Sequence, residues 1–114
     1  MDLELENSSS IIGEVTPPPS KSYGQRAIAA AFLANELDIY NLGCSRDERA
    51  GLDILRCCGM DIIQERSKIH ILNKFNFKSD VEIDCDESGL CARLFSTFFA
   101  LNEAETTITG HGHL

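Results

Sequence analysis

Residues 18–28 combine the side chains and backbone features that proteins use to bind anions. The side chains in question are those of Ser20, Lys21, Ser22 and Arg26. The prolines at positions 17–19 cannot lie inside a helix, because proline fixes φ and disfavours helical geometry in the residue before it. The segment therefore predicts an extended approach that runs into a helix capped by Ser20 or Ser22.

The charge at this helix start is unusual. Lys21 and Arg26 are the only Lys or Arg among the first 45 residues. A cation at a helix N-terminus is unfavourable by about 0.3–1 kcal/mol. The arrangement suits a negative ligand, because free backbone N–H groups, two hydroxyls and two cations would converge on a phosphate or carboxylate. The alternative is that both cations are solvated surface residues of an ordinary helix, and this stretch alone does not decide between the two.

Length and net charge narrow the class of protein. The 114 residues predict one domain with one core. The net charge of −8 argues against general binding to nucleic acid or to an anionic membrane, because both require a basic surface. Residues 1–10 do not resemble a signal peptide, and no apolar run is long enough to span a bilayer. We therefore expect a cytoplasmic protein that binds neither nucleic acid nor membrane.

The five cysteines predict reduced thiols, because they are odd in number and include no Cys-x-x-Cys pair. Cys57, Cys58 and Cys91 fall in helical patterns and are expected to be small buried side chains. His111 and His113 are flanked by glycines near the end of the chain, but two histidines without a third ligand make a poor metal site. We expect a mobile loop there and no bound metal.

Hydrophobic periodicity and turn residues predict a mixed α/β order of elements. Helices are expected at 21–35, between Ser45 and Gly59, and at 89–101. Strands are expected at 11–15, 37–42, 60–64, 68–72, 81–85 and 105–109. The strands at 60–64 and 68–72 form a hairpin, and residues 73–80 form a loop that packs down through two phenylalanines. Because the chain stops just after a strand, we expect it to be the front piece of something longer.

The second and third helices carry their own signals. Ser45 and Glu48 have the spacing of a capping box, and Gly59 fits the left-handed end of a helix. The third helix is expected to bury a stripe made of Leu90, Leu94, Phe98 and Leu101, widened by Cys91, Phe95 and Phe99. Arg93 follows Gly89 by four positions, as Arg26 follows Ser22, so a cation again lies near a helix start.

These motifs carry a resemblance to a known family. Pro19-Ser20-Lys21-Ser22-x-x-x-Arg26-Ala27 resembles the Pro-Gly-Ser-Lys-Ser-x-x-x-Arg-Ala segment near the start of 5-enolpyruvylshikimate-3-phosphate (EPSP) synthases. Ser88-Gly89-x-x-x-Arg93 resembles the family's Asn-Ala-Gly-Thr-x-x-Arg segment. Other segments resemble the same family more weakly. They are Asn41-Leu42, Ser45, Asp47, residues 55–59 and Ile108-Thr109-Gly110. The resemblance covers nearly all of residues 11–114, in the family's order.

The resemblance implies a fold. The family is an inside-out α/β barrel of two domains, each built from three β-α-β-α-β-β units, with the active site in the cleft between them. By analogy, residues 1–16 would be an N-terminal extended segment. Residues 17–85 would form the first unit, and residues 86–114 would be the truncated start of the next.

The resemblance also implies an activity. The family transfers the enolpyruvyl group of phosphoenolpyruvate to the 5-hydroxyl of shikimate 3-phosphate and releases phosphate, in aromatic amino-acid biosynthesis. The reaction passes through a tetrahedral intermediate and requires no metal or other cofactor. The groups that transfer protons lie in later segments of the family, so no catalytic residue is assigned here. We expect the 114-residue chain alone to be inactive.

Substrate-binding residues carry over by position. Lys21 would contact both substrates, and Ser22 with Arg26 would hold shikimate 3-phosphate. Gly89 would let a backbone N–H approach the phosphate of phosphoenolpyruvate. Arg93 would join that site or orient the domain interface. The chain departs from the family pattern at Pro19, Glu87 and Leu90, where the family has Gly, Asn and Thr, and these departures bear mainly on the phosphoenolpyruvate pocket.

Two alternatives stay open. The related transferase that acts on UDP-N-acetylglucosamine shares the fold, but its start motif has Lys-Asn, so Ser22 and Arg26 favour the shikimate interpretation. A non-catalytic module with a polyproline ligand at residues 17–19 is an alternative of another class. Its partner binding would survive Lys21→Ala and fail on Pro18→Ala. In either case, a piece cut from a larger sheet would expose apolar surface, so self-association is expected.

Overall fold

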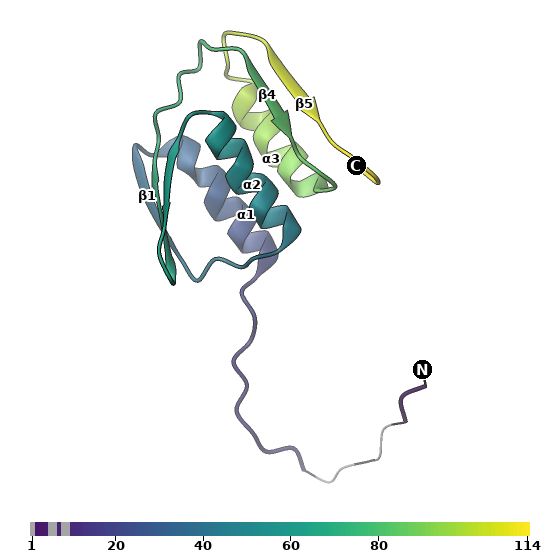
Figure 1. Ribbon diagram of the computed structural model, residues 1–114. Coiled ribbons are helices and arrows are strands. Elements are labelled where there is room, and N and C mark those ends of the chain that lie inside the picture. The colour runs from purple at the N-terminus through teal and green to yellow at the C-terminus, as the bar shows by residue number, and fades with distance from the viewer. Residues whose placement is uncertain (1, 5–6, 8–9) are drawn as a thin grey trace.

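The computed structural model describes residues 2–4, 7 and 10–114. Three helices lie side by side, with a three-stranded sheet on one side and a strand pair on the other (Figure 1). The helices are α1 (Lys21–Ala29), which continues into the 3-10 turn η1 (Ala30–Leu33), α2 (Arg46–Cys57) and α3 (Gly89–Phe99). The strands are β1 (Glu36–Tyr40), β2 (Asp61–Gln64), β3 (Lys68–Leu72), β4 (Val81–Asp84) and β5 (Thr106–Thr109). The predicted mixed α/β architecture is confirmed.

The two sheets differ in their pairing. The first has the order β1-β3-β2 and is antiparallel, so the hairpin predicted at 60–72 is confirmed. Ile69 and Ile71 of β3 are buried on one face, as their alternation with Lys68 and His70 predicts. In the second sheet β4 and β5 are parallel, and α3 is the crossover that parallel neighbours require.

Local signals explain α2 in full. Ser45 accepts a hydrogen bond from the Glu48 backbone N–H, and the Glu48 carboxylate accepts one from the Ser45 backbone N–H. This is the predicted capping box, which satisfies two of the helix's unpaired donors. At the other end Gly59 has a φ of 77°, a conformation that glycine adopts without steric strain.

The six phenylalanines of the chain form one cluster at the C-terminal ends of α1 and α3. Phe32 lies at its centre, with ring centroids 5.4–6.1 Å from those of five others. Those five are Phe75, Phe77, Phe95, Phe98 and Phe99. Phe75 and Phe77 come from the loop predicted at 73–80, so its packing through phenylalanine is confirmed.

The buried stripe of α3 differs from the predicted one. Cys91, Phe95 and Phe99 are its buried members, whereas Leu101 is 69% exposed and lies beyond the end of the helix. The helix is apolar over much of its circumference, so hydrophobicity alone leaves its rotation about its own axis undetermined. Contacts of Ser88 and Cys91 with α1 determine that rotation instead.

Two further predictions are wrong. Residues 11–15 form no strand, and Ile11 and Ile12 are each 95% exposed on an extended segment that leaves the domain (Figure 1). The apolar pattern there has no neighbouring strand to pair with among the described residues. Cys57 is exposed, because it lies on the outer face of α2, whereas the predicted burial of Cys58 and Cys91 is confirmed.

Burial changes the acidity of two of the thiols. All five cysteines are free, and burial raises the pKa of Cys58 to about 12 and that of Cys85 to about 11. Both thiols therefore stay protonated at neutral pH. The described helices include none that is long and apolar enough to cross a membrane. The division of the chain at residues 16 and 85 stays a prediction.

Candidate functional site

The N-terminal ends of α1, α2 and α3 lie at the same end of the helix layer (Figure 1). Each begins at a serine whose hydroxyl accepts a backbone N–H from the first turn: Ser20 from Tyr23, Ser45 from Glu48 and Ser88 from Cys91. Of the two caps proposed for α1, Ser20 is therefore the one used. Three positive dipole ends and their unpaired N–H groups gather in one region.

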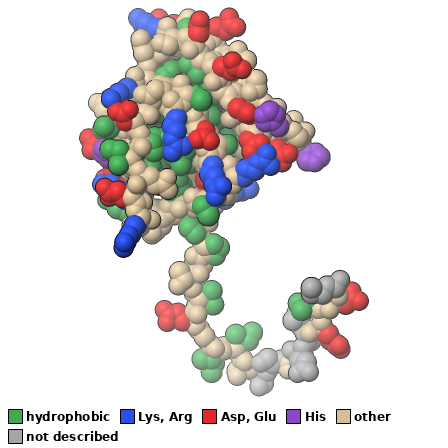
Figure 2. Space-filling model, in the orientation of Figure 1, with side chains coloured by type: hydrophobic (Ala, Val, Ile, Leu, Met, Phe, Trp, Pro, Cys, Tyr) green, Lys and Arg blue, Asp and Glu red, His purple; other side chains and the backbone are tan. Residues whose placement is uncertain are grey.

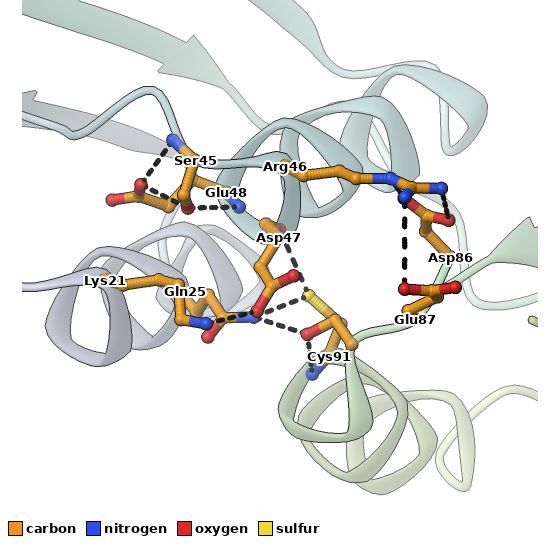
Figure 3. A network of polar contacts seen from close by, with 10 residues as sticks. Lys21, Gln25, Ser45, Arg46, Asp47, Glu48, Asp86, Glu87 and Cys91 are labelled. Carbon is orange, nitrogen blue, oxygen red and sulfur yellow. Dashed lines mark hydrogen bonds and ion pairs between the residues drawn. The ribbon is translucent and has the colours of Figure 1, made fainter. Parts of the chain in front are cut away.

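A buried hydrogen bond ties the start of α1 to the start of α3. The Gln25 side chain is 2% exposed, and its Nε2 donates to the Ser88 Oγ at 2.6 Å and to the Cys91 Sγ at 3.2 Å (Figure 3). Gln25 and Ser88 are 63 positions apart in the chain. The two motifs that carry the family resemblance therefore begin side by side in space. The sequence gives one signal for Gln25, its position one helical turn after Lys21 on the same face.

Lys21 reaches from α1 to the first turn of α2. Its Nζ lies 2.8 Å from the Asp47 Oδ2, and its side chain is 55% exposed (Figure 3). The hydrogen bond and the charge of Asp47 raise the pKa of the Lys21 ammonium above its ordinary value. Lys21 is therefore a charged, partly exposed group at the junction of the helix starts.

The Lys21–Asp47 ion pair leads us to predict how stability and the Lys21 pKa depend on Asp47. Because Asp47 raises the Lys21 pKa, the pair contributes stability below pH 10.5, and that contribution is lost as the pH rises through the raised pKa. Asp47→Asn should return the Lys21 pKa toward 10.5, measured by following the Lys21 Cε resonance through a pH titration in NMR. Glu103→Gln, which removes the carboxylate beside Lys78 on another surface, is the control and should leave Lys21 unchanged. A Lys21 titration curve that Asp47→Asn does not move would contradict the assignment.

Ser22 and Arg26 lie together on a neighbouring face of α1. Both are exposed, the Arg26 Nη1 donates to the Ser22 backbone carbonyl at 3.3 Å, and the guanidinium carbon lies 5.9 Å from the centroid of the Tyr23 ring. Arg26 does not join the Lys21–Asp47 pair. The structure thus presents the two cations of the first motif separately, Lys21 toward the other helix starts and Arg26 beside Ser22.

Gly89 is the first residue of α3 and is exposed. A Cβ built at this position would meet no atom within 4 Å, so the packing of the described residues does not require a glycine there. Arg93 lies exposed one turn further along the same helix. The second motif therefore has accessible backbone N–H groups at the start of α3, and Arg93 supplies a cation one turn further on.

Arg46 explains how the chain accommodates the carboxylate of Glu87. The Arg46 guanidinium forms a two-pronged ion pair with Asp86, at 2.5 and 2.7 Å, and lies 3.9 Å from Glu87 (Figure 3). Glu87, one of the departures from the resemblance, therefore turns toward a cation. Sequence reasoning missed Arg46, and the signal for it was a cation at the first position of α2, where the helix dipole disfavours one.

Glu48 is a buried carboxylate between α1 and α2. It is 2% exposed and accepts hydrogen bonds from the backbone N–H groups of Gly43 and Ser45 and from the Ser45 hydroxyl, at 3.1, 3.0 and 2.6 Å. It also lies directly against Gly24, where a Cβ would come within 2.3 Å of its Oε1. The close contact of the two helix starts therefore depends on the missing side chain of Gly24.

No group of three or more His, Cys, Asp or Glu among residues 2–4, 7 and 10–114 is arranged to hold a metal ion. His111 instead pairs with Asp84 at 2.7 Å. A hydrogen bond from the Asp86 backbone N–H, together with the one from His111, lowers the pKa of the Asp84 carboxyl.

Comparison with known proteins places these features in a family. The profile of EPSP synthase (3-phosphoshikimate 1-carboxyvinyltransferase) matches residues 5–114. A 3-phosphoshikimate 1-carboxyvinyltransferase of Methanobrevibacter smithii is 32% identical over 118 residues, which cover 100% of this chain and 27% of that protein. The enzyme of the same name from Thermodesulfovibrio yellowstonii is 33% identical over 119 residues, covering 100% and 28%. That of Picrophilus torridus is 35% identical over 97 residues, covering 84% and 23%.

The chain thus spans about a quarter of the length of the curated relatives it matches. The profile nevertheless covers all but the first four residues of the chain, including both motifs and all three helix starts. The chain belongs to the EPSP synthase family.

Proposed function

We propose that this chain supplies the N-terminal part of the substrate site of a 3-phosphoshikimate 1-carboxyvinyltransferase. The observation that carries the proposal is the buried Gln25–Ser88 hydrogen bond, because it holds the two motif-bearing helix starts next to each other. Two anionic substrates that react with each other must be bound side by side. A pair of adjacent helix starts, each with a nearby cation, meets that requirement.

The charge distribution supports the same conclusion. The chain carries a net charge of −8, so an anion would be repelled unless cations were concentrated locally. On the face shown in Figure 2, Lys and Arg side chains lie among carboxylates near the point where the N-terminal segment leaves the domain. Lys21, Ser22 and Arg26 begin the helix at that point. They add formal charges and a hydroxyl to the dipole ends of three helices.

The proposed roles follow from this placement. Lys21 contacts both substrates from the junction of the helix starts. Ser22 and Arg26, which lie together, hold shikimate 3-phosphate, with the guanidinium binding its phosphate through directional donors. The backbone N–H groups at Gly89 donate hydrogen bonds to the phosphate of phosphoenolpyruvate, and Arg93 adds a cation one turn away.

The reaction assigned to the complete enzyme is an addition followed by an elimination. The 5-hydroxyl oxygen of shikimate 3-phosphate gives up its proton and bonds to C2 of phosphoenolpyruvate, while C3 gains a proton. The bond from C2 to the phosphate oxygen then breaks as C3 loses a proton, and inorganic phosphate leaves. In the family the proton-transfer groups come from later segments. We therefore expect the 114-residue chain to bind substrate without turning it over.

A titration of the chain with shikimate 3-phosphate, followed by NMR, tests the proposal. Backbone amides of residues 20–26 should shift saturably, and Lys21→Ala should weaken binding by about tenfold or more, because a charge-assisted hydrogen bond contributes roughly 1.5–3 kcal/mol. Lys78→Ala removes an exposed lysine of another surface and is the matched control. A folded wild-type sample whose amides do not respond at millimolar ligand would count against a site formed within this chain.

The two alternatives give different results in the same experiment. A relative that acts on UDP-N-acetylglucosamine would shift residues 20–26 with that sugar nucleotide and not with shikimate 3-phosphate. The polyproline alternative has one supporting observation, the exposure of residues 17–19 outside any helix or strand. It requires partner binding that Pro18→Ala abolishes and Lys21→Ala leaves intact.

A further inference from the structure

A hollow lies between α2, the β2–β3 turn and the proline segment at residues 16–19. It encloses about 790 Å³, and its lining includes none of Lys21, Ser22, Arg26, Gly89 or Arg93. Four of the ten Lys and Arg side chains in the whole chain line it instead: Arg49, Arg56, Arg66 and Lys68. We infer that this hollow binds a small organic carboxylate with an apolar body, at a site that contains neither Lys21 nor Arg26.

The cations of the hollow differ in how far they are already neutralised. Arg56 pairs with Asp53 at 2.6 Å, and Lys68 pairs with Asp38 at 3.0 Å. Neither Arg49 nor Arg66 forms an ion pair with another described residue. Two guanidiniums are therefore left to bind an anion, and a guanidinium matches the planar, two-oxygen geometry of a carboxylate.

Three elements place these two guanidiniums around one space. Arg49 lies on the exposed face of α2, where Asp53 and Arg56 follow at helical spacing. Arg66 lies in the exposed turn that joins β2 to β3, and Pro17 and Pro19 complete the rim. The hairpin and α2, which form two walls of the hollow, are anchored in the core through Ile69 and Leu52.

The remaining lining selects the kind of anion. Leu42, Leu52 and Ile69 contribute apolar surface, which favours a ligand with an apolar ring or chain. Asp53 and Glu65 also line the hollow, and their charges oppose a ligand with several negative charges. A single carboxylate on an apolar body satisfies both conditions better than a free phosphate does.

Titration of the 114-residue chain with benzoate, followed by NMR, tests the inference. Amides of residues 41–44 and 64–69 should shift saturably. Acetate, which has the carboxylate without the apolar ring, and inorganic phosphate, which has more charge without it, should each bind at least about tenfold more weakly. Benzoate that causes no saturable change at these residues in a folded sample overturns the inference.

Matched variants separate a specific site from a general effect of charge. Arg49→Gln and Arg66→Gln should each weaken benzoate binding about tenfold or more, whereas Lys78→Gln, with the same loss of charge, should not. Both arginines are exposed, so neither substitution endangers the fold. Equal effects from all three variants would overturn the inference. So would benzoate shifts confined to residues 20–26 and abolished by Lys21→Ala, because the anion would then belong to the helix starts.

Discussion

Phe32→Ala is expected to lower the free energy of unfolding by about 3–5 kcal/mol, the range for removing a buried phenylalanine. Phe32 is 7% exposed and is the one ring that contacts all five other phenylalanines. Its removal leaves a cavity bounded by rings of α3 and of the loop at 73–80. Domains of this size have about 5–15 kcal/mol of stability, so much of the total would be lost.

Urea unfolding followed by circular dichroism measures this effect. Phe32→Leu retains more of the buried volume and should be less destabilising than Phe32→Ala. Leu33→Ala changes the neighbouring side chain, which is 76% exposed, and should have little effect. A Phe32→Ala protein within about 1 kcal/mol of wild type would show that the cluster does not hold the helix ends together.

Gly24→Ala is expected to destabilise the protein by about 1–3 kcal/mol, the range for overpacking a filled site. The new Cβ would lie 2.3 Å from the Glu48 Oε1 and 2.9 Å from the Leu42 Cδ1. Glu48 cannot move away freely, because its carboxylate accepts three hydrogen bonds while buried. Helix propensity alone predicts that Gly24→Ala stabilises the protein, since alanine is favoured over glycine by about 1 kcal/mol in a helix interior.

Thermal or urea unfolding distinguishes these two expectations by sign. Gly89→Ala is the matched control, because a Cβ there meets no atom and stability should not fall. A double-mutant cycle with Glu48→Ala tests the cause. With the carboxylate removed, the added methyl should lose most of its cost, so the two substitutions should be strongly non-additive. A stabilised Gly24→Ala protein would refute the close contact between α1 and α2.

The parts of the fold that the sequence predicts well are those with local causes. The capping box of Ser45 and Glu48, the left-handed Gly59 and the alternation of β3 each involve residues a few positions apart. The rotation of α3 and the absence of a strand at 11–15 were not predictable in this way. Both depend on which distant segments are available as neighbours.

The candidate site also has a part that local sequence predicts and a part that depends on distant contacts. Residue types and spacing identify Lys21 and Gly89 as members of two motifs, because each motif is contiguous. The contacts that bring the motifs together join different helices: Gln25 with Ser88, and Arg46 with Asp86 across 40 positions. No periodicity connects such positions, so these positioning contacts emerge only from the fold.

The buried Gln25–Ser88 bond also bears on what ligand binding requires of the protein. Because this bond forms within the chain itself, α1 and α3 already stand at a fixed separation before any anion arrives. Association then has to order few protein groups, chiefly the exposed Lys21 and Arg26 side chains, at about 0.5–1.5 kcal/mol each. The helix starts are in this sense preorganised, and the conformational entropy that binding would otherwise remove has already been lost during folding.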